Sequence, residues 1–145
     1  MRPTLRLGIA AGLLLLTGAL GAEQPAAFKV IVNPANPTSA LARAELSRIF
    51  LKRLDHWEHG IKVLPIDLPV TAEVRESFSQ AVHGRRASAI KSYWQQQIYS
   101  GRGVPPPEGG SEEEVVAYVR ANPGAIGYVS PATRTDGLKA IELRD

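Results

Sequence analysis

The sequence predicts an α/β domain with a small mixed sheet flanked by helices. Short apolar runs rich in β-branched residues alternate with segments whose apolar residues recur every three or four positions. Loops rich in proline, glycine, asparagine and serine separate these segments. Because strands and helices alternate along the chain, a layered α/β arrangement is favoured over an all-helical or all-strand fold.

Four apolar runs predict the strands of this sheet. The second run contains Pro65, which cannot donate to a strand ladder and therefore favours an edge or a bulge. In the third run, Gly127 interrupts the apolar residues, and a glycine inside a strand marks the close approach of another segment or of a ligand. The runs lie at residues 28–32, 61–68, 125–129 and 138–143.

Four segments predict helices. In the first, Leu46, Ile49 and Phe50 lie on one stripe. The second opens at Thr71, and the last opens at Ser111, which begins a capping box with an acid three residues later. The segments cover residues 41–51, 71–82, 87–99 and 111–122.

The first 22 residues have the pattern of a secretory signal peptide. Arg2 and Arg6 form a basic start, an apolar run follows, and small residues up to Ala22 offer a cleavage site. The apolar run is shorter than the roughly 20 residues of a transmembrane helix, although an uncleaved anchor is the alternative. We therefore expect residues 23–145 to form one exported domain.

Composition argues against several classes of function. The formal net charge is +3, and two arginines lie in the predicted leader, so the remainder is nearly neutral. A nucleic-acid-binding surface needs a basic excess that this remainder lacks. Without cysteine the chain has neither a disulfide framework nor a thiolate metal site. An exported domain without cysteine fits a bacterial periplasm.

Three motifs in series resemble those of the substrate-binding proteins of phosphate ABC transporters. They read AELSRIFLKRLDHWEHG at 44–60, VLPIDLPVTAEVRESF at 63–78 and EEEVVAYVRANPGAIGYVS at 112–130. The resemblance implies a periplasmic-binding-protein-like fold of type II. It also implies noncovalent binding of a small anion, phosphate by default, and an inner-membrane transporter or other periplasmic protein as partner. Proteins of this family have two lobes, and the motifs here match one lobe only.

The resemblance places the anion site at the start of the second helix. A helix N-terminus favours anions through its free N–H groups and its dipole. The family's Ser-Gly-Thr corresponds here to Ala72, Glu73 and Val74, so its hydroxyls and glycine are absent and a carboxylate is added.

Hydroxyls and one arginine near this helix remain candidate ligand contacts. Thr71 is expected to cap the helix, and Arg75 either faces the anion or is a solvated arginine. The loop after the first strand offers two further hydroxyls. The candidate ligand-binding residues are Thr38, Ser39, Thr71, Ala72 and Arg75.

Other hypotheses remain open. The missing Ser-Gly-Thr favours a degenerate lobe that binds no ligand and serves as a periplasmic protein–protein interaction module. A homodimer would reconcile the two hypotheses by forming a cleft from two copies. Asp55, His56, Glu58 and His59 are potential metal ligands, but they lie in a predicted loop, so we expect neither a metal site nor a cofactor. No nucleophile with its base is recognisable, and we expect no enzyme.

Overall fold

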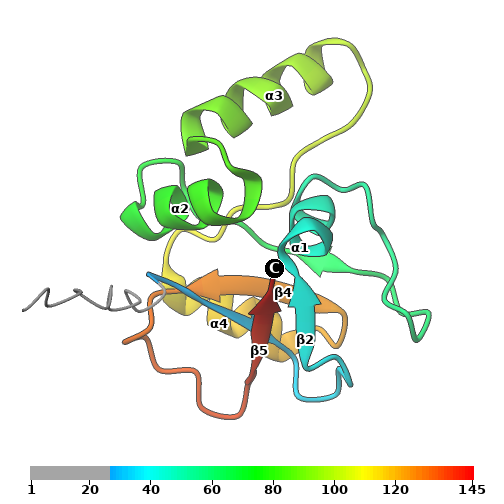
Figure 1. Ribbon diagram of the computed structural model, residues 1–145, viewed down its shortest axis with the longest axis vertical. Coiled ribbons are helices and arrows are strands. Elements are labelled where there is room, and N and C mark those ends of the chain that lie inside the picture. Colours follow the sequence, from blue (N-terminus) through cyan, green and yellow to red (C-terminus); the bar gives the residue numbers. More distant parts are fainter. Residues whose placement is uncertain (1–26) are drawn as a thin grey trace, which may run out of the picture.

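The computed structural model describes residues 27–145, so the predicted signal peptide lies outside the described residues. The described chain forms one mixed sheet of five strands together with helices, which confirms the predicted α/β fold class (Figure 1). No helix among these residues is long and apolar enough to cross a bilayer.

The five strands are short. They are β1 (Lys29–Val32), β2 (Ala40–Ala42), β3 (Leu64–Pro65), β4 (Ala125–Val129) and β5 (Lys139–Arg144). Their order in the sheet is β2-β5-β1-β4-β3. The central β1 is antiparallel to β4 and β5, whereas the edge strands β2 and β3 run parallel to β5 and β4.

The edge strand β3 is much shorter than the predicted run at 61–68, but it has the edge position that Pro65 favours. The N–H groups of Leu64 and Ile66 donate to the carbonyls of Gly124 and Ile126 at 2.9 and 3.0 Å. Pro65 lies between these two donors, so its missing N–H group costs the ladder nothing.

The helices are α1 (Arg43–Phe50), α2 (Glu73–Phe78), α3 (Ala87–Tyr99) and α4 (Glu112–Ala121). A π-helical turn, η1 (Ser79–His83), continues α2 directly. The predicted range of α3 is confirmed. α1 begins later than predicted because Leu41 belongs to β2, a strand that the sequence did not predict.

Strand β4 is covered on both faces, because alternate residues of a strand point to opposite sides. On one face α4 packs directly on the backbone of Gly127, where a Cβ would lie 2.6 Å from Val115 Cγ1 and 3.3 Å from Val119 Cγ2. On the other face the ring of Tyr128 stacks on Phe78 of α2, with centroids 3.8 Å apart. The predicted close approach at Gly127 is therefore confirmed, and a helix makes it.

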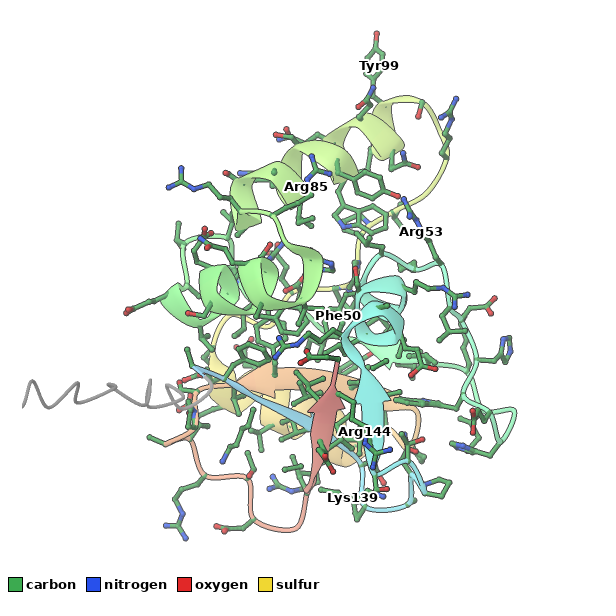
Figure 2. All side chains as sticks on the ribbon, viewed as in Figure 1. Phe50, Arg53, Arg85, Tyr99, Lys139 and Arg144 are labelled. Carbon is green, nitrogen blue, oxygen red and sulfur yellow. The ribbon has the colours of Figure 1, made fainter. Side chains whose placement is uncertain are left out.

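The aromatic core on the α2 side also contains Phe28 and Phe50. Phe50 lies between the helices and the sheet (Figure 2), with its centroid 4.8 Å from that of Phe78 and 5.6 Å from that of Tyr128. This cluster joins α1 and α2 to β4.

Helix α3 lies beyond α2, at the end of the molecule farthest from the sheet (Figure 1). Its Ala87, Ile90 and Trp94 are buried against the body. Ile98 and Tyr99 in its last turn are 52% and 95% exposed. The last turn of α3 therefore projects into solvent, beyond the part of the helix that is buried.

Candidate functional site

An open cleft of about 480 Å³ lies where the start of α2 meets the start of α4. Leu68, Pro69 and Val74 form part of its apolar wall. The polar side chains that line it are the hydroxyls of Thr71, Ser77, Ser111 and Ser130 and the carboxylates of Glu73 and Glu112. Two helix N-termini and four hydroxyls thus share one cavity.

The first turn of α2 has no side-chain cap. Ala72 occupies the N-cap position in an extended conformation and can make no cap hydrogen bond. The prediction that Thr71 caps this helix is wrong, because a turn closed by Ala72 N–H and Pro69 O at 2.9 Å starts the helix one position later. The N–H groups at this start are therefore left for water or a ligand.

The start of α4 is capped and carries a negative charge. Ser111 Oγ accepts from the N–H of Glu114 at 3.2 Å, as the capping box predicted. The carboxylate of Glu112 accepts from the N–H and hydroxyl of Ser130 and from Thr133 Oγ1. Burial raises the pKa of Glu112, but these hydrogen bonds outweigh burial and hold that pKa below its usual value. The hydroxyl of Ser130 is consequently committed to Glu112.

Arg75 faces the interior of the protein, away from this cleft. Its side chain is 5% exposed, its Nε lies 3.2 Å from Asp67 Oδ1, and its Nη1 donates to the carbonyl of Leu68. Nη1 also lies 3.2 Å from a carboxylate oxygen of Glu108, and the hydroxyl of Tyr128 donates to Asp67. Burial raises the pKa of Asp67 despite the guanidinium beside it. Both predictions for Arg75, an anion contact and a solvated side chain, are corrected by this buried ion pair.

Thr38 and Ser39 are also remote from the cleft. Ala27, which precedes β1, lines the cleft, whereas the two hydroxyl residues follow that strand at its opposite end. The N–H of Thr38 donates to Asn36 Oδ1, and the carbonyl of Ser39 accepts from Glu142, both at 2.9 Å. Of the five candidate ligand residues, the structure brings only Thr71 and Ala72 to one cavity.

The polar loop at 55–59 forms no cluster of ligands. His56 Nδ1 contacts Asp55 Oδ1 at 3.0 Å, and Trp57, which follows them, is buried, with its Nε1 donating to Gly124 O. Within residues 27–145 no group of three or more His, Cys, Asp or Glu side chains is placed to hold a metal ion.

Sequence reasoning missed Ser77, Ser111 and Ser130 as cleft residues. The cap at Ser111 was recognisable, but its neighbourhood was not. Ser130 lies near Ser111 only because β4 and α4 pack side by side, and the hydrogen bond between Ser130 and Glu112 joins residues 18 positions apart. No local pattern reports such a contact.

No protein-family model matches this chain, and no curated protein matches its sequence. Solved structures do share its fold. An ABC-type phosphate transport receptor from Vibrio cholerae has a TM-score of 0.63 and 20% identity, and the match covers 81% of this chain and 47% of that one.

Two further structures give the same result. A putative phosphate ABC transporter substrate-binding protein with bound phosphate, from Clostridium perfringens, has a TM-score of 0.65 and 17% identity over 81% of this chain and 44% of that one. A possible phosphate binding protein from Planctomyces limnophilus has a TM-score of 0.62 and 17% identity over 82% and 42%. The chain spans less than half the length of these proteins. It therefore shares the periplasmic-binding-protein-like fold of these proteins over that part of their length.

Proposed function

We propose that this chain is a periplasmic solute-binding-protein-like domain that binds a small anion noncovalently, with phosphate as the first candidate. The observation that carries the proposal is the uncapped start of α2, which opens into a cleft with the hydroxyls of Thr71 and Ser111 beside it. Free N–H groups at a helix start favour an anion. The fold shared with phosphate-transport receptors supports this choice of ligand class.

Two carboxylates oppose an anion in this cleft, so we expect weak binding. Glu112 already accepts three hydrogen bonds, which spread its charge. Glu73 is exposed, and two unit charges about 4 Å apart in water repel by only about 1 kcal/mol. Each hydrogen bond to a charged group contributes about 1.5–3 kcal/mol. A few N–H and hydroxyl donors therefore suffice to offset the exposed carboxylate.

We assign no catalytic activity, although one serine–histidine pair exists. Ser47 Oγ and His83 Nδ1 are 2.8 Å apart. Burial, with the nearby Arg75 and Arg85, lowers the pKa of His83 to about 4. A general base works best when its pKa lies near the operating pH, so this histidine is too weak a base to activate a serine at neutral pH.

Isothermal titration of residues 23–145 with inorganic phosphate at low ionic strength tests the proposal. Glu73→Gln should strengthen phosphate binding about fivefold, because it removes about 1 kcal/mol of repulsion. Glu58→Gln makes the same charge change in the exposed loop and should leave the affinity unchanged. If folded wild type and Glu73→Gln both give no heat with millimolar phosphate, the cleft is not a phosphate site.

Location and assembly are further parts of this proposal. The leader motif supports export to the periplasm, where a transporter of the inner membrane is the expected partner. Mass determination of the exported protein would locate the cleavage site, and we expect the mature protein to begin near residue 23.

Light scattering would test the homodimer hypothesis, and a strictly monomeric protein would exclude it.

A further inference from the structure

A second groove, of about 400 Å³, lies between the end of α1 and the last turns of α3. Its walls are Lys52 and Arg53 after α1, Tyr93 and Trp94 of α3, and the loop at 102–104. It shares no lining residue with the α2–α4 cleft. We call it the α1–α3 groove.

The α1–α3 groove is basic. Lys52, Arg53 and Arg102 line it, and no acidic side chain does. Within residues 27–145 none of these three cations forms an ion pair with a carboxylate. The α2–α4 cleft, by contrast, is lined by two carboxylates and no cation. An anion therefore meets opposite electrostatic fields at the groove and at the cleft.

Two of these cations, Arg53 and Arg102, follow a residue with a left-handed backbone at the end of a helix. Lys52 follows the end of α1 and has a φ of 56°, the one positive φ of a non-glycine residue in the described chain. The N–H of the next residue, Arg53, donates to Arg48 O at 2.8 Å. Gly101 follows the end of α3 with a φ of 69°, and the N–H of Arg102 donates to Gln97 O at 2.9 Å. The backbone of each arginine is thus held at the end of one of the two helices.

Aromatic side chains complete the groove. The guanidinium carbon of Arg53 lies 5.9 Å from the centroid of the Tyr93 ring, a cation–π contact that limits the motion of the arginine. Trp94 is 6% exposed, and its Nε1 is buried without a hydrogen-bond partner in the described chain. Beside Gly103, where a Cβ would lie 3.9 Å from Trp94 Cζ3, the indole ring forms part of the groove's wall.

We propose that the α1–α3 groove binds a polyvalent oxyanion of the phosphate class that is joined to a second phosphate or to an apolar body. Three unpaired cations match two or more negative charges, and arginine forks suit phosphate oxygens. The exposed side chain of Val104 borders the groove and offers an apolar contact. The proposal does not rest on the proposed function of the cleft, because it uses none of its residues.

Such an anion has two sources, a soluble diphosphate or the headgroup of an anionic lipid. The end of α3 carries the exposed apolar side chains Ile98 and Tyr99, and Tyr99 points into solvent at the tip of the molecule (Figure 2). Ser100 and Gly101 connect this tip to Arg102, which lines the basic groove. Both sources present the same phosphate chemistry to the arginines.

Titration with inorganic pyrophosphate tests the soluble source. We expect saturable binding to wild type and a loss of about tenfold or more in affinity for Arg102→Glu and for Arg53→Glu. Arg85→Glu makes the same charge change at an exposed arginine that does not line the groove, and it should retain the wild-type affinity (Figure 2). Equal weakening by all three variants would mean diffuse attraction only and would overturn the proposal.

The indole N–H signals in NMR spectra distinguish ligand binding from a purely structural role of the two arginines at the helix ends. The chain has two tryptophans, and Trp57→Phe identifies the Trp94 signal. Pyrophosphate should shift the Trp94 indole N–H signal in wild type and in Arg85→Glu, and not in Arg102→Glu. If Arg53 and Arg102 only stabilise the helix ends, their variants should lose stability. In that case pyrophosphate should not shift the Trp94 indole N–H signal of the wild type either.

Co-sedimentation with vesicles tests the lipid source. Vesicles that contain phosphatidic acid, whose headgroup is a phosphate monoester able to carry a second negative charge, should bind wild type and not Arg102→Glu if the headgroup is the ligand, and vesicles of phosphatidylcholine should bind neither. Binding of either pyrophosphate or anionic vesicles, lost in Arg102→Glu and kept in Arg85→Glu, supports the groove and identifies the source. Absence of both kinds of binding in the folded wild type overturns the proposal, whatever phosphate does at the cleft.

Discussion

Replacing Arg75 with alanine tests whether this residue stabilises the fold or contacts a ligand. The substitution leaves Asp67 buried without its partner, since the two side chains are 5% and 7% exposed and 3.2 Å apart. Removing one member of a buried ion pair costs about 3–5 kcal/mol. The contact with Glu108 adds little, because that side chain is 54% exposed. We therefore expect Arg75→Ala to lower the free energy of unfolding by about 3–5 kcal/mol, a large part of the stability of an ordinary domain.

The loss in Arg75→Ala should grow as the pH rises. Burial raises the pKa of Asp67 in the wild type, and Arg75 opposes that rise. Without Arg75 the folded-state pKa of Asp67 moves further above the unfolded value, so the folded variant keeps a proton that the unfolded chain releases. Between the unfolded and the folded pKa, the stability of the variant falls with increasing pH. The deficit relative to wild type should therefore be larger at about pH 8 than at about pH 5.

Urea denaturation followed by circular dichroism at both pH values measures this deficit. Arg85→Ala is the control at an exposed arginine. The double variant Asp67→Asn, Arg75→Met removes both charges and keeps an acceptor for Tyr128, so it should recover most of the lost stability. A deficit below about 1 kcal/mol in Arg75→Ala, or no recovery in the double variant, would refute the structural role of the ion pair.

Two further predictions concern packing and protonation. Gly127→Ala should destabilise the protein by about 1–3 kcal/mol, because its Cβ would lie 2.6 Å from Val115 Cγ1. Denaturation should show a smaller cost in a Val115→Ala background, and equal costs would contradict the close approach. The pKa of His83 is lowered from 6.5 to about 4 by burial and nearby arginines, so its neutral form stabilises the fold above pH 6.5 and that contribution is lost as the pH falls toward 4. Relative to His83→Gln, wild type should lose at most about 3 kcal/mol over this interval, and parallel pH profiles of the two proteins would refute the assignment.

The parts of the fold that were predictable from the sequence are those with local signals. The helix at 87–99 follows from its apolar stripe, and the start of α4 follows from the cap at Ser111, whose hydrogen bond is made between neighbours in the chain. The close approach at Gly127 was also predictable, because a glycine within an apolar strand leaves room that a neighbouring segment fills. In each case the signal that predicts the feature lies within a few neighbouring residues of the sequence.

The parts that were not predictable depend on contacts between distant segments. The strand β2 has three residues and exists because it pairs with β5, about 100 positions later. Arg75 occupies a position that resembles a ligand-binding motif, but its buried partners Asp67 and Leu68 decide where its guanidinium points. A sequence pattern records the residue type at a position and not which neighbour the fold brings to it.

The opposite charges of the α1–α3 groove and the α2–α4 cleft allow salt to distinguish anion binding at one from binding at the other. Attraction and repulsion between exposed charges are both screened, over a length of about 10 Å at 0.1 M salt. At the α1–α3 groove, where three cations attract the ligand, affinity should fall as salt rises. At the α2–α4 cleft the carboxylates of Glu73 and Glu112 repel the anion, so screening offsets part of that repulsion and affinity should change little or rise. Phosphate binding that weakens steeply with salt would therefore not belong to the cleft, and its loss in Arg102→Glu would assign it to the groove.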